Sequence, residues 1–502
     1  MRVPVLRARR MGIDTYQERV AYMRSDCEVC KAEGFEARAR IELRCGGQCV
    51  VATLNVVHSS LLGREEIGLS EAAWSALGQA EGAPVQLGHP APLQSFSAVR
   101  GKIFGRPLTN DAATAIVADV RAGRYSDIEM AALVTACSGG RMDVVETIAL
   151  TRAMIGAGQR LHWNSALVVD KHCVGGLPGN RTTLLVVPIV AACGLVIPKT
   201  SSRAITSPAG SADAMETLAP VTLDVTRIRA VVEQEGGCIA WGGAVSLSPA
   251  DDLLIRVERP LGLDSDGLLV ASILSKKVAA GSTHVLIDIP VGRTAKVRSA
   301  QAAADLASRL KAVGQALGLT VEVLVTDGAQ PVGTGIGPAL EARDVLAVLR
   351  GDAGAPDDLR QRALLLAGAV LEMGGKAGPG EGTALARKVL DSGAAWAKFQ
   401  AICEAQGGMR EPPVAAHTHV VRALHSGVIV AVDNRAIALL AKLAGAPGAV
   451  AAGISFAARL GRQVVTGDAL LTLHAESPGA LAYAIAYAES QEHLVTIQQS
   501  VC

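Results

Sequence analysis

Aromatic side chains are scarce in this chain of 502 residues, and neither sign of charge dominates it. Phe, Tyr and Trp together make up 3%, which argues against a stacking surface for single-stranded nucleic acid. Lys and Arg number 48 and Asp and Glu number 47, so a net charge of +1 gives no bulk attraction to nucleic acid or to an anionic membrane. We therefore expect no nucleic-acid partner and no membrane partner. An anionic ligand would therefore have to bind at a local site that supplies its own positive charge or hydrogen-bond donors.

Long apolar runs are also lacking, although the mean hydropathy is +0.32. The longest candidate, residues 183–197, is interrupted by Pro188 and Gly194 and is shorter than the roughly 20 residues that a membrane helix needs. We expect it to be a buried strand or helix. The arginines near the N-terminus are not followed by an apolar segment, so we expect no secretory signal. The ten cysteines are then expected to be reduced thiols in the cytoplasm.

The length predicts three or four domains, and a hydrophobic fraction of 50% is ample for their cores. Residues 1–92 are β-rich, with strand-like segments on both sides of Gly46-Gly47 that predict a hairpin. A short helix is expected at 70–77, and prolines at 84, 90 and 92 suggest a domain boundary. Residues 110–158 have a helical pattern, with a capping box at Ser126 and Glu129.

After residue 165 the pattern changes to strands alternating with helices. Strands are expected at 166–170, 284–289 and 321–325, with a helix at 299–318 that Ser299 caps. This alternation predicts a mostly parallel sheet covered by helices. Near the C-terminus we expect a strand at 427–432, a turn between strands at 464–470 and a closing helix at 478–492.

Two loops have the composition of an oxyanion site. Residues 169–183, VDKHCVGGLPGNRTT, place three glycines, two threonines and one lysine after a strand. Exposed backbone N–H groups, hydroxyls and a lysine are what phosphate needs, although an ordinary strand-to-helix loop is an equal alternative. Residues 199–216, KTSSRAITSPAGSADAME, crowd hydroxyls around Arg203, which suits phosphate or sugar. The alternative there is a solvated serine-rich turn with Ser211 as a helix N-cap.

These two segments, together with SPADDLLIRVERPLGLDSDGLLVASILSKK, resemble the thymidine phosphorylase family. The SSRAITS motif is most similar to that of the AMP phosphorylase-like branch of the family, whose extra N-terminal domain matches residues 1–92. The segments DGAQPVGTGIGPALEARDV and HSGVIVAVDNRAIALLAKLAGAP also agree. The resemblance covers nearly the whole chain in collinear order.

The resemblance implies a multidomain α/β fold. A small β-rich N-terminal domain (1–92) would be followed by a helical domain (93–165, with a segment near 250–275). A large central α/β domain with a mixed sheet (166–410) would bind phosphate. The C-terminal α/β domain (411–502) would be like that of pyrimidine nucleoside phosphorylases and contain a barrel-sandwich element. Family members close a cleft by domain rotation, for which residues 333–337 could be a hinge, and they form homodimers or larger homo-oligomers.

The implied reaction is phosphorolysis of an N-glycosidic bond, giving free base and a (deoxy)ribose 1-phosphate or ribose 1,5-bisphosphate, with inorganic phosphate as co-substrate and no cofactor. The phosphate-contacting positions are Lys171, Cys173, Thr183, Ser201 and Ser211. Cys173 is a departure, because serine is usual there and a thiol is a weaker donor. The resemblance places the proton donor at Asp264, and His172 is a second candidate acid or base-contacting group.

The preferred substrate depends on a second departure. The nucleotide-binding positions of the AMP phosphorylases are Gly176, Ser202, Arg203, Ala204, Ile205, Thr206, Ser207, Ser211, Ser272 and Lys296. Pyrimidine nucleoside phosphorylases hold the base with Arg, Ser and Lys; here Ser272 and Lys276 are present, but the Arg position falls on Glu258 or Arg259. Because Lys296 and Arg203 suit a 5′-phosphate, we favour a nucleoside 5′-monophosphate, with thymidine as the alternative.

Other hypotheses remain open at this stage. A non-catalytic assembly protein of the same fold would explain the Cys173 departure, although the other site residues are intact. A phosphoribosyltransferase would need a magnesium-binding acidic pair, for which Asp251-Asp252 is the single candidate. The spacing of Cys27, Cys30, Cys45 and Cys49 makes a weak case for structural zinc, with buried thiols as the alternative. We therefore expect no metal at the active site.

Overall fold

The computed structural model describes residues 5–204, 207–263, 265–491 and 493–499. The chain divides into two compact units, one made of residues 1–157 and 250–268 and the other of 158–249 and 269–502. Each unit is described by itself. The boundary expected near residue 92 stays a prediction. Among the described residues, none of the helices combines the length and apolar character that a membrane span requires.

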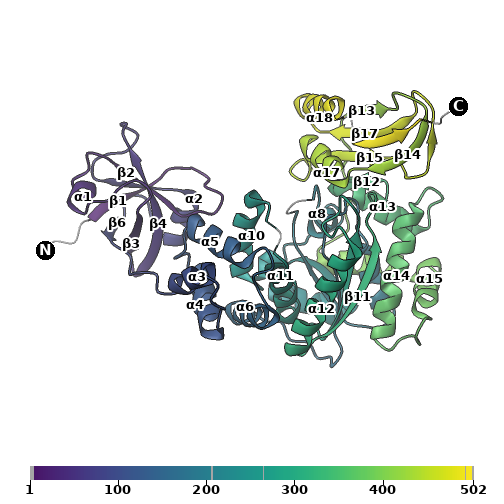
Figure 1. The fold of residues 1–502 in the computed structure, drawn as a ribbon, viewed down its shortest axis with the longest axis horizontal. Helices are drawn as coiled ribbons and strands as arrows, with labels where there is room; N and C mark the ends of the chain where they lie inside the picture. Colours follow the sequence, from purple (N-terminus) through teal and green to yellow (C-terminus); the bar gives the residue numbers. More distant parts are fainter. Residues whose placement is uncertain (1–4, 205–206, 264, 492, 500–502) are drawn as a thin grey trace. The chain divides into compact units, whose positions relative to one another are not determined.

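The first unit begins with a closed six-stranded barrel, labelled in Figure 1. Its order is β1 (Val5–Arg10), β5 (Glu66–Leu69), β2 (Val20–Arg24), β4 (Gln48–Val57), β3 (Arg40–Cys45) and β6 (Pro84–Gly88). Alternation fills the core, because Ile41, Leu43 and Cys45 of β3 are buried. Short helices α1 (Glu28–Ala32) and α2 (Glu71–Leu77) accompany the strands. The predicted hairpin is confirmed: β3 and β4 pair antiparallel around Gly46-Gly47.

The hypothesis of a zinc site is wrong. Cys27, Cys30 and Cys45 are buried in the barrel core, whereas Cys49 is exposed. The hairpin register explains this, because Cys49 lies opposite Arg44, one position away from Cys45, and so belongs to the other face of the sheet. Within the described residues, no group of three or more His, Cys, Asp or Glu could hold a metal ion.

The rest of the first unit is helical. It comprises α3 (Phe96–Ile103), α4 (Asn110–Arg121), α5 (Asp127–Cys137), α6 (Val144–Ala157) and α10 (Pro249–Leu261). The capping box at Ser126 and Glu129 is confirmed at the start of α5. A buried ion pair between Lys102 and Glu146 joins α3 to α6. Arg256 of α10 pairs with Asp127, which ties this later segment to the bundle.

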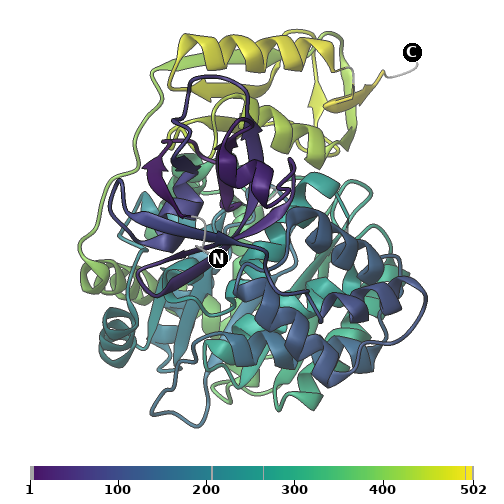
Figure 2. The ribbon, with the colours of Figure 1, turned by 90° about the vertical axis from the view of Figure 1, so that its left-hand side faces the viewer.

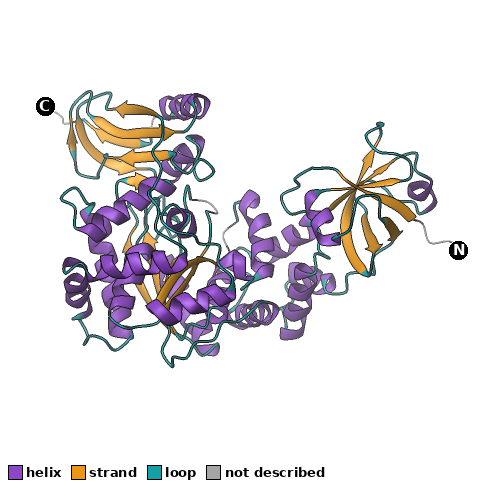
Figure 3. Ribbon diagram, turned by 180° about the vertical axis from the view of Figure 1, so that it is seen from behind, coloured by secondary structure: helices purple, strands orange, loops and turns teal. Residues whose placement is uncertain are grey.

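The second unit is built on parallel strands covered by helices, shown in orange and purple in Figure 3. Strand β10 (His284–Val291) pairs with β7 (Val169–Cys173) on one side and β11 (Thr320–Asp327) on the other. Strands β8 (Ile197–Ser201) and β9 (Gly237–Trp241) form a second parallel pair. An isolated bridge between Val168 and Val196 links the two sets, giving the order β9-β8-β7-β10-β11.

The mixed sheet expected for this domain is wrong, because every described pair among β7 to β11 is parallel. A helical crossover returns the chain to the end of the sheet at which the previous strand began, so consecutive strands run in the same direction. The helices of this unit are α7 (Thr183–Ala192), α8 (Ser211–Glu216), α9 (Val225–Glu235), α11 (Asp266–Ala279, which begins in the first unit), α12 (Ala300–Ala316), α13 (Pro338–Arg350), α14 (Asp357–Met373), α15 (Gly382–Asp391) and α16 (Ala394–Gln406), with a 3₁₀ turn at Gly242–Val245.

Several local predictions are confirmed here. The apolar run after residue 183 is a buried helix, α7, which contacts α14 and α16 in the core. Ser299 caps α12 by accepting a hydrogen bond from the Ala302 N–H at 3.1 Å. The strand expected at 166–170 begins later, at Val169, where pairing with β10 starts.

The C-terminal part contains two antiparallel sheets. One has the order β12 (Gly335–Ile336), β15 (Gly453–Phe456), β17 (Ala469–Ala475) and β13 (His417–Arg422); the other has β16 (Gln463–Val464), β14 (Gly427–Val432) and β18 (Val495–Gln498). Helices α17 (Asn434–Leu443) and α18 (Pro478–Ser490) pack with them, and Figure 2 shows α18 as a yellow helix lying along the strands. Strand β18 was not expected, and β12 joins this sheet from far earlier in the sequence.

Candidate active site

The strand order creates a switch point between β7 and β10. The chain proceeds outward from β7 to β8 and β9, then returns to the other side as β10 and β11. Ligands of open α/β sheets bind outside the carboxyl ends of the strands at such a point. The loops that follow β7 and β10 meet there, since a Cβ added to Gly176, at φ +81°, would lie 2.4 Å from the backbone nitrogen of Lys296. Glycine is thus required at 176.

Lys171 is the cation of this crevice. It is 1% exposed, and its Nζ donates to Thr182 Oγ1 at 2.7 Å and lies 4.0 Å from Asp288 Oδ2 on β10. Burial lowers the pKa of Lys171, and the Asp288 carboxylate opposes that shift. The ammonium is therefore held at a fixed place by one hydroxyl and one carboxylate.

Cys173 lies beside these groups. Its sulfur accepts a hydrogen bond from Asn180 Nδ2 at 3.3 Å, and the same amide is 3.4 Å from Asp288 Oδ2. Burial and the nearby carboxylate raise the pKa of the thiol to about 12. Cys173 is therefore a neutral thiol at physiological pH, able to donate weakly to an oxyanion but not to repel it.

His172 is half-buried on β7, next to Lys171. Burial is the largest cause that lowers its pKa well below 6.5, and the charges of Lys277, Lys199, Lys171 and Lys276 add to it. The imidazole is therefore neutral near pH 7. It can donate or accept one hydrogen bond, but near pH 7 it is not an imidazolium acid.

Asp170 of β7 connects this strand to its neighbours through two buried lysines. Lys277 Nζ of α11 donates to its Oδ2 at 2.7 Å, and Lys199 Nζ of β8 lies 3.4 Å from its Oδ1. All three side chains are buried. One carboxylate therefore faces two lysine amino groups, and burial lowers the pKa of Lys277 to about 7. This cluster fixes β7, β8 and α11 to one another at the base of the crevice.

The second loop begins at the carboxyl end of β8. Ser201 is 8% exposed, and its hydroxyl has no hydrogen-bond partner in the described part of the chain. Farther along, Ser207 Oγ donates to the Ala209 carbonyl at 2.7 Å, and Gly210 packs against Ser202, whose carbonyl oxygen would be 2.5 Å from an added Cβ. Ser211 is the first residue of α8, with Gly210 as the N-cap, so the alternative of a Ser211 N-cap is wrong.

Arg203 pairs with acidic side chains of α8. Its guanidinium pairs with both oxygens of Glu216 and lies 3.3 Å from Asp213 Oδ1, and it stacks 4.8 Å from the ring centroid of Trp241. Hydrogen bonding to Glu216 raises the pKa of Arg203. Its charge is therefore balanced within the loop.

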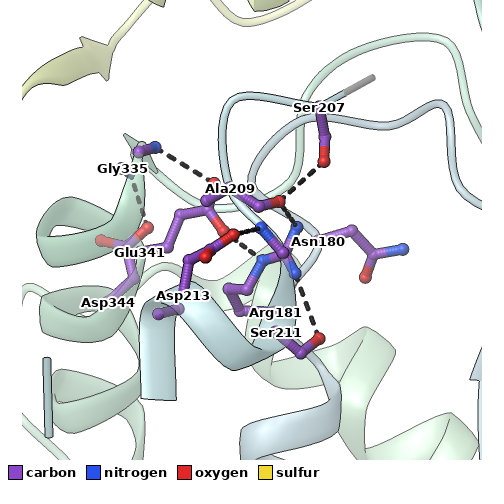
Figure 4. A network of polar contacts seen from close by, with 12 residues as sticks. Asn180, Arg181, Ser207, Ala209, Ser211, Asp213, Gly335, Glu341 and Asp344 are labelled. Atoms are coloured by element: carbon purple, nitrogen blue, oxygen red, sulfur yellow. Dashed lines mark hydrogen bonds and ion pairs between the residues drawn. The ribbon is translucent and has the colours of Figure 1, made fainter. Parts of the chain in front are cut away.

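Arg181 joins the two loops, as Figure 4 shows. Its Nη1 donates to Ser211 Oγ at 3.1 Å and its Nη2 to the Ala209 carbonyl at 3.0 Å. Its Nε forms an ion pair with the buried carboxylate of Glu341 on α13. The loop after β7 and the loop after β8 thus share one buried support.

Comparison with known proteins agrees with this architecture. Residues 165–396 match the family model of the glycosyl transferase family a/b domain, residues 97–158 its helical bundle domain, and residues 428–494 the pyrimidine nucleoside phosphorylase C-terminal domain. A protein of Polaromonas sp. strain JS666 named "Putative thymidine phosphorylase" is 65% identical over 98% of this chain and 96% of its own. A protein of Hahella chejuensis with the same name is 56% identical over 98% of this chain and 97% of its own.

The chain belongs to the thymidine phosphorylase family. It is accordingly a pentosyltransferase. Anthranilate phosphoribosyltransferase from Thermus thermophilus has a TM-score of 0.52 at 24% identity, covering 62% of this chain and 99% of that chain. This likeness shows a shared fold alone.

As a member of this family, the protein brings together many of the residues that its sequence singles out. Lys171, His172, Cys173 and Thr183 belong to β7, the loop after it and the start of α7, and Ser201 and Ser211 flank the second loop. Ser202, Arg203, Ala204 and Ser207 lie in that loop; Gly176 and Lys296 touch across the switch point. Their roles stay predictions. Ile205, Thr206 and Asp264 lie outside the described residues.

The base end is less defined. Ser272 and Lys276 are half-buried one turn apart on α11, and the neighbouring Lys277 fixes that helix to β7. Arg259 is exposed near the end of α10, with its Nη1 3.4 Å from the Tyr16 hydroxyl. Glu258 is half-buried on the same helix.

Sequence reasoning missed four supporting residues: Asp170, Asp288, Glu341 and Lys277. Asp170 and Lys277 stand within the two matched segments, beside Lys171 and Lys276, so their positions were visible but not their pairing. Asp288 had no local signal, and Glu341 stands within the matched segment DGAQPVGTGIGPALEARDV, which gives no sign of its pairing. They come from β10 and α13, which only the folded chain brings to the loop after β7.

Proposed function

We propose that this protein catalyses phosphorolysis of a pyrimidine nucleoside, with thymidine as the first candidate, giving thymine and 2-deoxyribose 1-phosphate. The reaction class is supported by the groups gathered near the switch point, where Lys171, Cys173 and the Ser201 hydroxyl, which has no hydrogen-bond partner among the described residues, lie on β7 and β8. The substrate is supported by relatives 56–65% identical that are named as thymidine phosphorylases.

The mechanism follows from this geometry. A phosphate oxygen attacks C1′ as the bond from C1′ to the base nitrogen breaks, and the base leaves with that electron pair and takes up a proton. Lys171 and the hydroxyl groups hold the phosphate dianion and reduce the cost of bringing it to the sugar. Neutral His172 would donate a hydrogen bond to the departing base, while Asp264 stays the predicted proton donor. No cofactor takes part in this proposal.

The structure also bears on the nucleotide hypothesis, which rested on Arg203 and Lys296. We infer that Arg203, paired with Glu216 and Asp213, contributes less charge toward a 5′-phosphate than that hypothesis assumed. Lys296 does lie at the crevice, against Gly176. A nucleoside 5′-monophosphate is therefore kept as the second candidate substrate on the position of Lys296.

A phosphorolysis panel tests the proposal. The purified protein is incubated with thymidine, uridine, AMP, CMP or UMP, with and without inorganic phosphate, and free base is measured by chromatography. We expect phosphate-dependent release of thymine, which Lys171→Met abolishes. Release from monophosphates alone would replace the substrate with the second candidate. Absence of phosphate-dependent release from all five would favour the non-catalytic hypothesis. The same preparation tests, by light scattering, the expected homodimer or larger homo-oligomer.

A further inference from the structure

The buried ion pair between Arg181 and Glu341 supports the oxyanion site from beneath. Arg181 is 7% exposed and Glu341 is 1% exposed. We propose that these two are positioning residues, which hold the Ser211 hydroxyl and the loop at 207–211 in the geometry that binds phosphate. The inference rests on the proposed function and adds to it two residues that are not among the predicted contacts of phosphate or nucleoside.

The arginine contacts three protein groups. One edge of its guanidinium donates to Ser211 Oγ and to the Ala209 carbonyl, while Nε faces Glu341. The Ala209 carbonyl also accepts from Ser207 Oγ, so the arginine fixes a turn that already has an internal bond. A rigid planar fork of this kind orients several acceptors at once, which the flexible ammonium of a lysine cannot do.

Donation from Arg181 also orients the Ser211 hydroxyl. The oxygen accepts from Nη1, so its own hydrogen is free to point elsewhere and donate to an anion. Removal of the arginine would let the hydroxyl rotate and the loop relax. The expected consequence is weaker phosphate binding, with nucleoside binding little changed.

Glu341 holds more than the arginine. It accepts a hydrogen bond from the Gly337 N–H at 3.1 Å, and Asp344, one turn later on α13, accepts from the N–H groups of Thr334 and Gly335 at 2.7 Å. Figure 4 shows Glu341, Asp344 and Gly335 beside the loop that carries Ala209 and Ser211. The start of α13 therefore links the connector at 333–337 to the phosphate loop.

A buried ion pair by itself is weak evidence of function, because such a pair can serve stability alone. The chain offers a matched control in Lys102 and Glu146, a buried pair of the helical bundle whose carboxylate likewise accepts backbone hydrogen bonds. Both pairs should lower stability when broken. Only the Arg181 pair should change the affinity for phosphate.

The test compares Glu341→Gln, Arg181→Lys and the control Glu146→Gln. Folding is checked by thermal unfolding, phosphate binding is measured by calorimetry, and the KM values for phosphate and thymidine are determined separately. We expect Glu341→Gln and Arg181→Lys to weaken phosphate binding and raise the phosphate KM at least tenfold, with the thymidine KM changed less than twofold. Glu146→Gln should lower the melting temperature and leave both KM values unchanged.

Two results would overturn the inference. One is unchanged phosphate affinity in a folded Glu341→Gln protein; the other is wild-type affinity in Arg181→Lys, which would mean that charge alone suffices. Calorimetry separates this inference from the proposed function. If wild-type protein binds phosphate but releases no base, the proposed function fails while the positioning role is still measured. If wild-type protein binds no phosphate, both fail.

Discussion

Replacement of Ser201 by alanine should stabilise the protein and damage its activity at the same time. The hydroxyl lies at the carboxyl end of β8, is almost fully buried and has no hydrogen-bond partner in the described part of the chain. An unpaired buried hydroxyl costs about 1–3 kcal/mol. Since alanine removes it without leaving a large cavity, the free energy of unfolding in phosphate-free buffer should rise by about 1 kcal/mol.

The same change removes a donor to phosphate. A hydrogen bond to a charged group contributes about 1.5–3 kcal/mol, so the phosphate KM should rise roughly 10- to 100-fold. The thymidine KM should change little. The stabilisation that phosphate gives to wild-type protein in a denaturant titration should shrink correspondingly, because a ligand stabilises only through its affinity for the folded state.

The matched control is Ser70→Ala in the barrel. Ser70 is also fully buried, but its oxygen accepts hydrogen bonds from the N–H groups of Val20 and Ala73 as the N-cap of α2. Its loss should cost about 1 kcal/mol of stability and leave both KM values unchanged. Loss of stability in Ser201→Ala with an unchanged phosphate KM would refute the reasoning, because the hydroxyl would then be structural.

Three further predictions concern the same crevice. Cys173→Ser should lower the phosphate KM by up to about tenfold, since a hydroxyl donates more strongly than a thiol; steady-state kinetics would contradict this if the KM stayed equal or rose. Gly176→Ala should reduce kcat/KM more than Gly175→Ala, because both have φ near +85° (81° and 90°) but only Gly176 meets a neighbouring backbone; equal losses would show that strain alone matters. Burial lowers the pKa of Lys277 from 10.5 to about 7, so between these two pH values Lys277 is protonated in the unfolded chain but not in the folded chain. The free energy of unfolding should therefore rise by about 1 kcal/mol per pH unit relative to the Lys277→Met variant. Parallel stability curves of the two proteins in chemical denaturation at pH 7.5–9.5 would contradict this prediction.

Local signals were enough to predict many elements of the fold. The capping box at Ser126, the cap at Ser299 and the Gly46-Gly47 hairpin each depend on neighbours within a few residues, and all three are confirmed. Strand β18 was missed because it is short and follows a helix, and its pairing with β14 is established only in the folded chain. The faces of the cysteines likewise depend on register, which spacing alone does not give.

The residues of the candidate site also differ in whether local sequence could predict them. The loops after β7 and β8 were visible as glycine- and hydroxyl-rich segments, because their chemistry is written in consecutive residues. The carboxylates that hold them were not, because Asp288 and Glu341 come from strands and helices far along the chain. A sequence shows which groups could touch a ligand more readily than it shows which groups hold them in place.

Arg203 illustrates the consequence for substrate prediction. A lone arginine among hydroxyls suggested a phosphate ligand, but Asp213 and Glu216, which follow on α8, form ion pairs with it. Asp213 Oδ2 also accepts the N–H groups of Ala204 and Gly210, at 2.6 and 2.7 Å, so donors at both ends of the loop are bound internally. The charge offered to a ligand is the residue's charge less what its neighbours neutralise. By that measure we expect the second loop to contribute hydroxyls and shape rather than charge to a phosphate at the crevice, and Lys171, 4.0 Å from Asp288, to contribute only part of its charge.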